Sequence, residues 1–519
     1  MSATLSLASV LAEAARRYPG KTAVVDGAVR LTYAELWEQA RTYAAGLREL
    51  GVGPGDTVAL IAPNVADFPR AYFAITALGA AVVPVHLLLT PDEAAYTLTD
   101  SRADLVVCHT SMLTLGRGAA AGAGLPLVTV GPVPGDPVPG DVGVPRLEDT
   151  TVPPLVSYVS RDAGDPAVVF YTSGTTGEPK GAVLTHLNLV MNATVNAFDS
   201  HDVGPDDVVL GCLPLFHTFG QTVSMNSTFR RGGTLVLLPR FSGEAAIEAM
   251  VAEDVNVFHG VPTMYIALLE AAAGRDLPSL RLCISGGASL PVAVLERFDA
   301  AFGTTIYEGY GLSETSPTAS VNQPHFGTRP GTVGHPIWGV EVEIARADVE
   351  ERIEWLPPGE LGEIVIRGHN VFSGYLGRPE ETAKVVVDGW FRTGDLGQKD
   401  AEGFVSIVDR KKDVIIRGGF NVYPREVEET LARHPAVAQV AVVGMPDDRY
   451  GEEIWAVVVP AGELDPAALV SWAQERLGKH KYPRHVRVVG ELPLGPSHKV
   501  LKREVRRALA EAEEGLRGD

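Results

Sequence analysis

The sequence contains little cysteine. Only Cys108, Cys212 and Cys283 occur in 519 residues, and they lie far apart without the short spacings of metal ligands. A disulfide framework or a cysteine-based zinc site needs paired or closely spaced cysteines, so neither is expected. So few thiols fit a reducing compartment, and we therefore expect a cytoplasmic location.

Basic residues are outnumbered by acidic ones. The chain has 44 Lys and Arg against 64 Asp and Glu, which gives a formal net charge of −20 and a pI near 5.1. Broad docking onto nucleic acid or an anionic membrane needs clustered positive charge, so no nucleic-acid partner is expected. An anionic ligand would need a locally built site.

Long hydrophobic runs are also missing. The longest, residues 76–89, is shorter than the roughly 20 residues of a membrane-spanning helix and contains Pro84 and His86. We interpret this run as a buried strand and expect no transmembrane segment. The N-terminal stretch S-L-A-S-V-L-A-E-A-A-R-R-Y lacks a basic start before a continuous apolar core, and it predicts an amphipathic helix rather than a secretion signal.

What the sequence does contain is apolar residues, at 45% of the chain, enough for roughly two to four folding units. Up to about residue 130, β-branched runs at 57–61, 81–85 and 105–107 alternate with helical patterns. This alternation of strands and helices is typical of βαβ units around a parallel sheet. A connector rich in Pro, Gly and Asp covers residues 131–154, and a second α/β region then runs to about residue 303.

Short strands separated by Gly and Pro occupy residues 331–408, as in a small β-barrel-like unit. A charged cluster, two glycines and a mixed α+β tail follow Asp409, where we place a hinge. The predicted fold is therefore α/β, with a large N-terminal domain over residues 1–409 that holds two α/β sheet subdomains and the β unit. A small, mobile α+β C-terminal domain over residues 410–519 completes the chain.

Glycines and hydroxyls gather in the string Y-T-S-G-T-T-G-E-P-K-G at residues 171–181. Glycines let backbone N–H groups approach phosphate oxygens, hydroxyls add donors, and a lysine offsets phosphate charge, so the string predicts a cradle for ATP. It lacks the spacing G-x-x-x-x-G-K-[ST] of the common nucleotide-hydrolase loop. A flexible surface turn is the alternative. The candidate phosphate-binding residues are Thr172, Ser173, Gly174, Thr175, Thr176, Gly177 and Lys180.

The full string resembles the phosphate loop of the adenylate-forming superfamily, which includes acyl-CoA synthetases, peptide-synthetase adenylation domains and beetle luciferases. Further motifs resemble that superfamily in the same order, and the resemblance covers almost the whole chain. They are L-P-L-F-H (213–217), S-G-G-A (285–288), Y-E-G-Y-G-L-S-E-T (307–315), W-F-R-T-G-D-L (390–396) and D-R-K-K-D-V-I-I-R-G-G-F-N-V-Y-P (409–424). The resemblance is closest to fatty-acid–CoA ligases and implies ATP, Mg²⁺ and coenzyme A as cofactors.

The resemblance also implies roles for single residues. Tyr310 would stack on adenine, Asp395 would accept hydrogen bonds from the ribose hydroxyls, and Thr172 and Glu314 would hold Mg²⁺, which prefers carboxylate and phosphate oxygens. Taken alone, Tyr310 would more often be a core residue and Glu314 a solvated charge. The further nucleotide or coenzyme contacts implied are Gly287, Ala288, Glu308, Gly309, Gly311, Ser313, Arg410, Gly418 and Gly419.

Catalysis would rest on Lys499 and His217, with Lys412 as the hinge between the domains. In the superfamily the late lysine stabilises charge between the carboxylate and the α-phosphate. Relatives usually have Gly before it, whereas this chain has His498, and Ser313 stands where many relatives have Thr. These departures concern local loop geometry and keep the charged and hydroxyl groups.

The acyl site is expected at Phe216 and His217, beside an apolar slot formed by Gly260, Val261, Gly286 and Gly287. No Asp is present where amino-acid-activating relatives pair the α-ammonium, so a medium- or long-chain fatty acid joined to coenzyme A is the first prediction. Several alternatives stay open: an aryl acid of the coumarate kind, an acyl-carrier-protein acceptor, luciferase-like oxidation and a non-catalytic nucleotide-binding scaffold. A homodimer is likewise left open.

Overall fold

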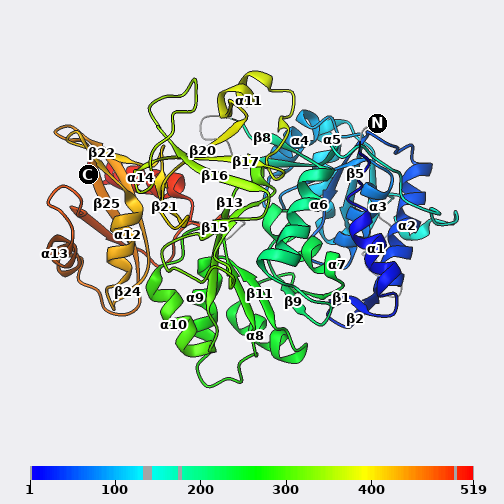
Figure 1. The fold of residues 1–519 in the computed structure, drawn as a ribbon, viewed down its shortest axis with the longest axis horizontal. Coiled ribbons are helices and arrows are strands. Elements are labelled where there is room, and N and C mark those ends of the chain that lie inside the picture. Colours follow the sequence, from blue (N-terminus) through cyan, green and yellow to red (C-terminus); the bar gives the residue numbers. More distant parts are fainter. Residues whose placement is uncertain (1–2, 132–142, 173–177, 496–499, 518–519) are drawn as a thin grey trace.

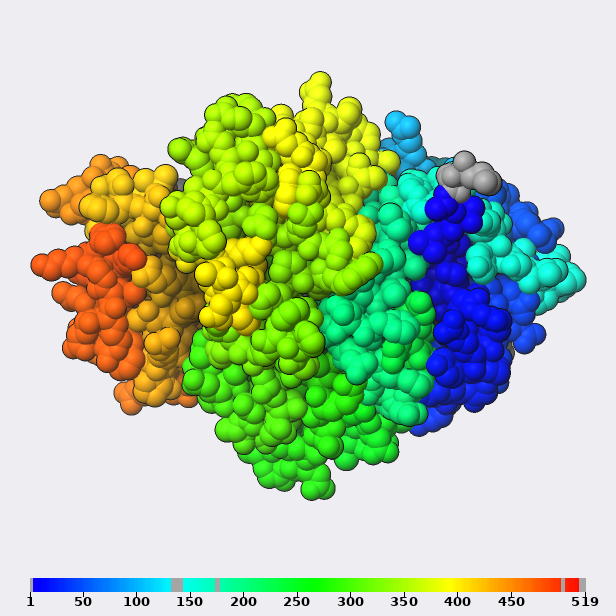
Figure 2. All heavy atoms as spheres, viewed as in Figure 1, coloured from blue at the N-terminus to red at the C-terminus, as the bar shows by residue number. Residues whose placement is uncertain are grey.

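The computed structural model describes residues 3–131, 143–172, 178–495 and 500–517. It contains four β-sheets flanked by helices. Figure 1 shows the blue N-terminal helices at one end of the molecule and the orange and red C-terminal elements at the other. The space-filling view in Figure 2 shows the same separation on the surface. The predicted α/β class, with a large N-terminal and a small C-terminal unit, is confirmed.

The first sheet has seven strands, most of them parallel. Only the β7–β8 and β8–β18 pairs are antiparallel. In spatial order the strands are β18 (Gly374–Tyr375), β8 (Lys180–Thr185), β7 (Pro166–Thr172), β4 (Ala81–Pro84), β3 (Thr57–Ile61), β5 (Leu105–His109) and β6 (Leu127–Val130).

The second sheet has nine strands, with a parallel centre and antiparallel edges. In spatial order they are β15 (His335–Pro336), β14 (Thr318–Val321), β13 (Ile306–Gly311), β12 (Leu282–Ser285), β11 (Val257–Gly260), β9 (Val208–Gly211), β10 (Thr234–Leu237), β1 (Thr22–Asp26) and β2 (Val29–Thr32). The two sheets therefore exchange strands, because the N-terminal β1–β2 hairpin joins the second sheet while β7 and β8 join the first.

The third and fourth sheets are small. The third is antiparallel and consists of β16 (Val340–Ala345), β17 (Gly362–Gly368), β20 (Trp390–Lys399), β19 (Val386–Val387) and β21 (Val405–Arg410). The fourth contains β23 (Phe420–Val422), β22 (Ile415–Arg417), β25 (Gly451–Pro460), β24 (Val437–Asp447) and β26 (His485–Val488). The chain leaves the third sheet at Arg410 and enters the fourth at Ile415, and the predicted domain boundary after residue 409 stays a prediction.

Helices cover the sheets, and several begin at capping residues. Thr32, Thr90 and Thr185 each accept a hydrogen bond from the backbone N–H three residues later, which satisfies a donor that the helix leaves free. The helices are α1 (Ser9–Arg17), α2 (Tyr33–Glu49), α3 (Asp67–Ala77), α4 (Pro91–Asp100), α5 (Leu113–Ala123), α6 (His186–Val195), α7 (Ser227–Arg231), α8 (Gly243–Ala252), α9 (Pro262–Ala271), α10 (Val292–Phe302), α11 (Pro379–Val385), α12 (Pro424–Ala432), α13 (Pro466–Arg476) and α14 (Lys502–Arg517).

Short helical segments complete the chain. Three are single 3₁₀ turns and two are π-helical, which is uncommon and often occurs at functional sites. They are η1 (Thr110–Met112), η2 (Leu147–Asp149), η3 (Asn196–Ser200), η4 (Phe219–Asn226) and η5 (Ser313–Thr315). Within the described ranges, no helix combines the length and apolar character that crossing a membrane requires.

Two sequence expectations need correction. The run 76–89 is not one strand, because α3 extends to Ala77 and only residues 81–84 form β4. The unit expected to begin at residue 331 begins later, because β15 still pairs with β14 of the second sheet. The run 76–89 is largely apolar, and such a pattern does not distinguish a buried helix from a buried strand.

Candidate active site

A large cavity is lined by residues of the first three sheets and of the C-terminal part of the chain. Its volume is about 1380 Å³, and its lining includes Thr172 and Lys180 of the first sheet and Tyr310 of the second. Asp395 lines it from the third sheet, and Leu501 from the C-terminal part of the chain. A concave pocket of this size with a few convergent polar groups is the default site for a small-molecule substrate.

Tyr310 and Asp395 form the polar centre of the cavity. The Tyr310 hydroxyl donates a 2.6 Å hydrogen bond to Asp395 Oδ2, and both side chains are less than a tenth exposed. Arg410 lies opposite Asp395 in the β20–β21 register, with its Nε 3.3 Å from Oδ1. Burial, and then the Asp395 charge, hold the pKa of Tyr310 well above its usual range, so its hydroxyl stays a donor at neutral pH.

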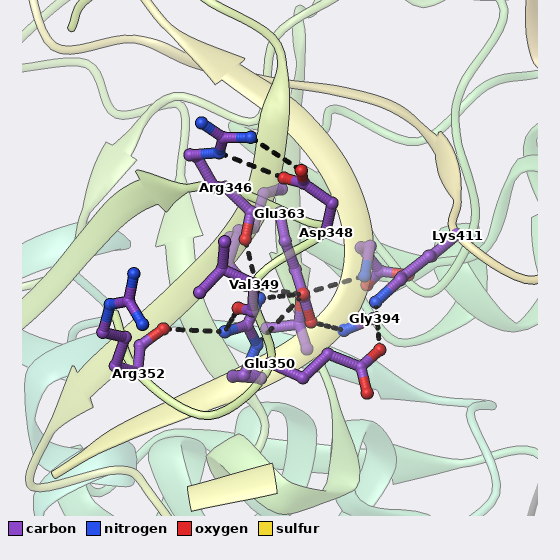
Figure 3. A network of polar contacts seen from close by, with 12 residues as sticks. Arg346, Asp348, Val349, Glu350, Arg352, Glu363, Gly394 and Lys411 are labelled. Carbon is purple, nitrogen blue, oxygen red and sulfur yellow. Dashed lines mark hydrogen bonds and ion pairs between the residues drawn. The ribbon is translucent and has the colours of Figure 1, made fainter. Parts of the chain in front are cut away.

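A buried ion pair supports the turn that carries Asp395. Arg392 donates from Nε and Nη2 to Glu363 Oε2 at 3.1 and 2.7 Å, and both side chains are 4% exposed. The other Glu363 oxygen accepts the Gly394 N–H at 3.0 Å. Figure 3 shows these groups converging beneath Gly394. The carboxylate thus ties strand β17 to the residue next to Asp395.

The remaining Arg392 donors also have partners. Nη1 reaches the carbonyl of Val349 at 2.6 Å, and Nη2 reaches that of Arg346 at 2.9 Å, both in the loop after β16. Figure 3 shows Arg346, Val349 and Arg352 of this loop around the same network. The sequence did not reveal this network. Arg392 lies inside the W-F-R-T-G-D-L motif, but Glu363 lies 29 residues earlier, in a strand that was predicted without a role for its glutamate.

The segment after Arg410 contacts both the cavity and the third sheet. Lys411 donates from its backbone to Gly394 O at 2.9 Å, and its Nζ lies 2.7 Å from Glu350 Oε1. Glu350, Lys411 and Lys412 all line the cavity. The predicted hinge residue therefore stands directly after a residue that is bound to the N-terminal part of the chain.

Glu314 and Thr172 line the cavity and could take part in holding a cation. Glu314 is buried, and its Oε1 accepts a 2.9 Å hydrogen bond from the Tyr375 hydroxyl, which leaves lone pairs of the carboxylate for a metal. Mg²⁺ commonly uses one or two protein carboxylates together with substrate phosphates, and the residues present fit that pattern. Burial raises the pKa of Glu314. A divalent cation would favour its ionised form.

Lys180 begins β8, directly opposite Thr172 in the antiparallel β7–β8 register. Its ammonium pairs with Glu381 and lies 5.3 Å from the centre of the Tyr375 ring. Both Tyr375 and Glu381 were missed in the sequence, since single tyrosines and glutamates carry no motif. An entering phosphate would compete with Glu381 for the lysine.

Gly311 permits a close approach of two backbone segments. A Cβ built there would lie 1.8 Å from the Pro317 carbonyl oxygen, so no larger residue fits without moving the backbone. Gly309 is less restricted, with Val321 Cγ2 at 3.3 Å. Ser313 lies close by, and its hydroxyl is 3.4 Å from that of Thr218. Gly309, Gly311 and Ser313 were predicted, whereas Pro317, Val321 and Thr218 were not.

Apolar and aromatic side chains line another part of the cavity. Phe216 packs edge-on against His86, with ring centres 4.8 Å apart, and the Phe219 ring would lie 3.1 Å from a Cβ at Gly286. His217 accepts the Phe219 N–H at its Nδ1, at 3.2 Å. Phe216, His217, Gly286 and Gly287 line the cavity, as expected from the sequence.

Other predicted site residues lie outside this lining. Gly260 and Val261 pack in the core, where a Cβ at Gly260 would be 2.8 Å from the Phe258 ring. Ala288 also lies outside the lining, and so does Glu308, whose Oε1 accepts the Leu290 N–H at 3.0 Å. The expectation that Gly260 and Val261 form the acyl slot is therefore corrected, because neither residue lines the cavity.

Gly418 and Gly419 form the turn of the β22–β23 hairpin, away from the cavity lining. Both have positive φ, 58° and 83°, as a two-residue hairpin turn of this hand requires. The Gly418 N–H donates to Tyr450 O at 2.8 Å. Leu494 and Leu501 line the cavity instead. In this arrangement the late segment faces the site and the hairpin does not.

Six predicted residues lie outside the described part of the chain. They are Ser173, Gly174, Thr175, Thr176, Gly177 and Lys499. Their described neighbours Thr172, Glu178, Val500 and Leu501 all line the cavity. These described neighbours of the two segments border the same space.

Comparison with known families decides the affiliation. Residues 11–376 match the model of the AMP-binding enzyme family, and residues 426–499 match its C-terminal domain. The chain belongs to the AMP-binding enzyme family. The predicted superfamily is thereby confirmed.

Curated relatives of this AMP-binding enzyme cover nearly its whole length. It is 39% identical to a feruloyl-CoA synthase from an Amycolatopsis species over 95% of this chain and 97% of the relative. It is 34% identical to a long-chain-fatty-acid–CoA ligase from Bacillus subtilis, over 96% of this chain and 94% of the relative.

Solved structures agree with this affiliation. ATP-bound MatB from Rhodopseudomonas palustris matches with a TM-score of 0.87 and 33% identity, over 98% of this chain and 99% of that one. The anthranilate CoA ligase AuaEII with anthranoyl-AMP matches with a TM-score of 0.90 and 27% identity, over 99% of both chains. The AMP-binding enzyme described here is thus an AMP-forming acyl- or aryl-CoA ligase, and the predicted cofactors ATP, Mg²⁺ and coenzyme A are confirmed.

Glu308 gives this AMP-binding enzyme a testable pH dependence. Burial raises the pKa of Glu308 from 4.5 to about 7, against the opposing field of Arg425. Between pH 4.5 and about 7, the Glu308 carboxyl is therefore protonated in the folded state and ionised in the unfolded state. Its stabilising effect is complete below pH 4.5 and is lost as the pH rises through about 7.

We expect Glu308→Gln to gain stability over the wild type as the pH rises, by about 3 kcal/mol between pH 4.5 and pH 8. Gln Oε1 can still accept the Leu290 N–H, so the change removes the ionisable group and keeps the hydrogen bond. Urea unfolding of both proteins at several pH values measures the difference. If the free energies of unfolding of the two proteins changed with pH in the same way, Glu308 would not titrate in this range.

Proposed function

We propose that this chain activates a carboxylic acid with an apolar body as its acyl adenylate and then transfers the acyl group to coenzyme A. The observation that carries the proposal is the single cavity. It joins the polar nucleotide residues Tyr310, Asp395 and Glu314 to an apolar part lined by Phe216 and Phe219. Adenylation requires that a carboxylate and an α-phosphate meet, and a shared cavity allows this.

In the first half-reaction, an oxygen of the substrate carboxylate would attack the α-phosphorus of ATP. The bond to the β-phosphate oxygen breaks, and acyl-AMP and pyrophosphate form. Asp395 would orient the ribose, Tyr310 would face the adenine, and Arg410 would lie near the α-phosphate. Bound Mg²⁺ would supply positive charge beside Glu314 and Thr172, and the phosphate loop with Lys180 would hold the outer phosphates.

Lys499 is the proposed electrostatic catalyst of that step, because an ammonium near the reacting atoms stabilises the charge that develops there. His217 would border the carboxylate at the entrance of the acyl part. The described residues Leu494 and Leu501 line the cavity on either side of the segment that contains Lys499 in sequence. This supports a role in adenylation for the present arrangement.

In the second half-reaction, the coenzyme A thiolate would attack the acyl carbon, and AMP would leave as the C–O bond to phosphate breaks. We place the hinge at Lys412 and the mobile domain at residues 410–519. Rotation there would bring the Gly418–Gly419 turn toward the cavity, where its lack of side chains suits the approach of a pantetheine arm. Two arrangements would let one site run both reactions.

For the acid, an aryl carboxylate is the first candidate. The feruloyl-CoA synthase relative supports it, and Phe216 and Phe219 offer ring faces for aromatic packing. A medium- or long-chain fatty acid, the first expectation from the sequence, is the second candidate. The long-chain ligase relative and the small residues Gly286 and Gly287 favour it.

The test is product analysis with purified protein, ATP, Mg²⁺, coenzyme A and a panel of aryl, fatty and dicarboxylic acids. We expect equal amounts of AMP, pyrophosphate and acyl-CoA, and no turnover when the acid is omitted. A phosphopantetheinylated carrier protein in place of coenzyme A tests the alternative acceptor. Failure of every acid to release AMP would overturn the proposal, and adenylate without thioester would restrict it to the first half-reaction.

The homodimer stays a prediction.

A further inference from the structure

His201 follows the π-helical turn η3 and lines the cavity together with Phe219, Val223, Ile284 and Ser285. None of these belongs to the proposed nucleotide residues. Phe219 and Val223 come from η4, and Ile284 and Ser285 end strand β12. This group of five residues, here called the acyl end, is apolar except for the imidazole and one hydroxyl.

Both ring nitrogens of His201 lack a hydrogen-bond partner within the described part of the chain, although the residue is only 3% exposed. The Ser285 hydroxyl is also buried and unpartnered there. Buried polar groups in folded proteins nearly always have partners, so such an exception at a cavity wall indicates a missing ligand group. Both residues face a cavity that must hold the acid.

Two other buried histidines, His259 and His186, differ from His201 in this respect. The His259 ring lies 5.7 Å from that of His201, but its Nδ1 pairs with Ser224 Oγ at 3.2 Å and it does not line the cavity. His186 is equally buried, yet its Nδ1 accepts the Leu7 N–H at 3.0 Å. His186 and His259 each leave only Nε2 without a partner in the described part of the chain, whereas His201 lines the cavity and leaves both nitrogens without one.

The charge state of His201 indicates which chemical group of a ligand it could bind. Burial, and then the nearby charge of Arg281, lower the pKa of His201 to about 3, so its ring is neutral at physiological pH. A neutral imidazole has one donor and one acceptor. A hydroxyl can satisfy both functions, whereas an alkyl terminus satisfies neither.

A carboxylate at this position would lack a counter-charge. The guanidinium of Arg281 is bound to Asp207 and lies outside the cavity lining. The cations that do line the cavity lie on β8 and α11 and in the segment 392–412 beside Asp395. Burying an unpaired carboxylate against a neutral ring would be strongly unfavourable.

We propose that the acid substrate carries a hydroxyl group at the end remote from its carboxylate, and that His201, with Ser285 beside it, selects for that hydroxyl. This assignment rests on the proposed function. It names hydroxylated acids, such as ring-hydroxylated aryl acids or ω-hydroxy fatty acids, as the substrate class. His201 is the specificity-determining residue within this class.

The experiment compares matched acids that differ only in the distal hydroxyl. For 4-hydroxycinnamate against cinnamate, and ω-hydroxydodecanoate against dodecanoate, kcat/KM is measured from acid-dependent AMP release with saturating ATP and coenzyme A. In the pair that the wild type uses better, we expect the hydroxylated acid to be preferred at least about tenfold. Sites built to bind a hydroxyl reject analogues that lack it by this much or more.

His201→Phe should bring this ratio to within about twofold of unity, chiefly by loss of activity on the hydroxylated acid. His201→Gln, which keeps a donor and an acceptor, should retain part of the preference. His186→Phe is the matched control, because it removes a buried neutral histidine outside the cavity lining and should leave the ratio unchanged. An undiminished preference in His201→Phe would overturn the assignment.

The wild-type ratio tests the inference even if His201→Phe does not fold. A ratio near unity, with both acids converted to thioesters, would mean that water satisfies His201 and that no hydroxyl is selected. That outcome overturns this inference and leaves the proposed ligase function intact. Absence of AMP with every acid overturns the proposed function instead.

Discussion

Arg392→Ala should lower the free energy of unfolding by about 3 to 5 kcal/mol, the usual cost of removing one partner from a buried ion pair. Glu363 would stay 4% exposed and lose its cation, keeping only the Gly394 N–H as a partner. The backbone carbonyls of Val349 and Arg346 would lose their donor as well. Urea unfolding at pH 7, compared with the wild type, measures the loss.

Arg367→Ala is the matched control. Arg367 also pairs with a glutamate across neighbouring strands, at 3.0 Å from Nε to Glu341 Oε1, but its side chain is 50% exposed. Such surface pairs contribute about 0 to 1 kcal/mol, so this variant should unfold almost like the wild type. If the two alanine variants lose the same stability, the buried pair is not a support of the Asp395 turn.

Lys499→Ala should slow acyl-adenylate formation by about 10² to 10³-fold, the typical effect of removing one charge-stabilising donor from a reaction site. ATP–pyrophosphate exchange with the preferred acid measures this half-reaction. The second half-reaction, started from pre-formed acyl adenylate and coenzyme A, should change by no more than about threefold, because the lysine is proposed to act only in the first.

Arg503→Ala serves as the control for this variant, since it removes an exposed cation four residues later and should leave adenylation close to the wild-type rate. Lys499→Arg keeps the charge on a longer, planar group and should recover part of the rate. Equal losses in both half-reactions would point to a general defect in folding or nucleotide binding, and would exclude the assigned role.

The fold was predictable where the sequence signal is local. The run 57–61 corresponds to β3 from end to end, and the short strands after residue 340 form an antiparallel sheet. The sheet membership was not predictable. The pairing of β1 with β10 joins Val24 to Leu235, and no local pattern reports a partner so distant in the chain.

Some residues of the site could be predicted from the sequence and others could not. Tyr310, Asp395 and Glu314 stand in recognisable motifs, and they line one cavity. Arg392 and Glu363 support Asp395 through burial, which arises only when β17 pairs with β20. A single arginine and a single glutamate otherwise look like surface charges in the sequence.

Residues that define the acyl end were also beyond sequence reasoning. His201 follows a π-helical turn, and a lone histidine in such a segment carries no pattern. Gly260 and Val261 looked like small slot residues but are buried outside the cavity lining, and a Cβ at Gly260 would meet the rings of Phe258 and Tyr265. Only the packed structure tells which face of a short buried strand meets a cavity.

The Gly418–Gly419 hairpin has its shape already fixed by two positive φ angles and by the hydrogen bond to Tyr450. It lies outside the cavity lining in this arrangement. On the proposed two-step scheme, the C-terminal domain must therefore sweep through solvent as one body before the thioester forms. The rate of thioester formation should then fall as the viscosity of the medium rises. The rate of adenylation, which uses the arrangement already in place, should not depend on viscosity in this way.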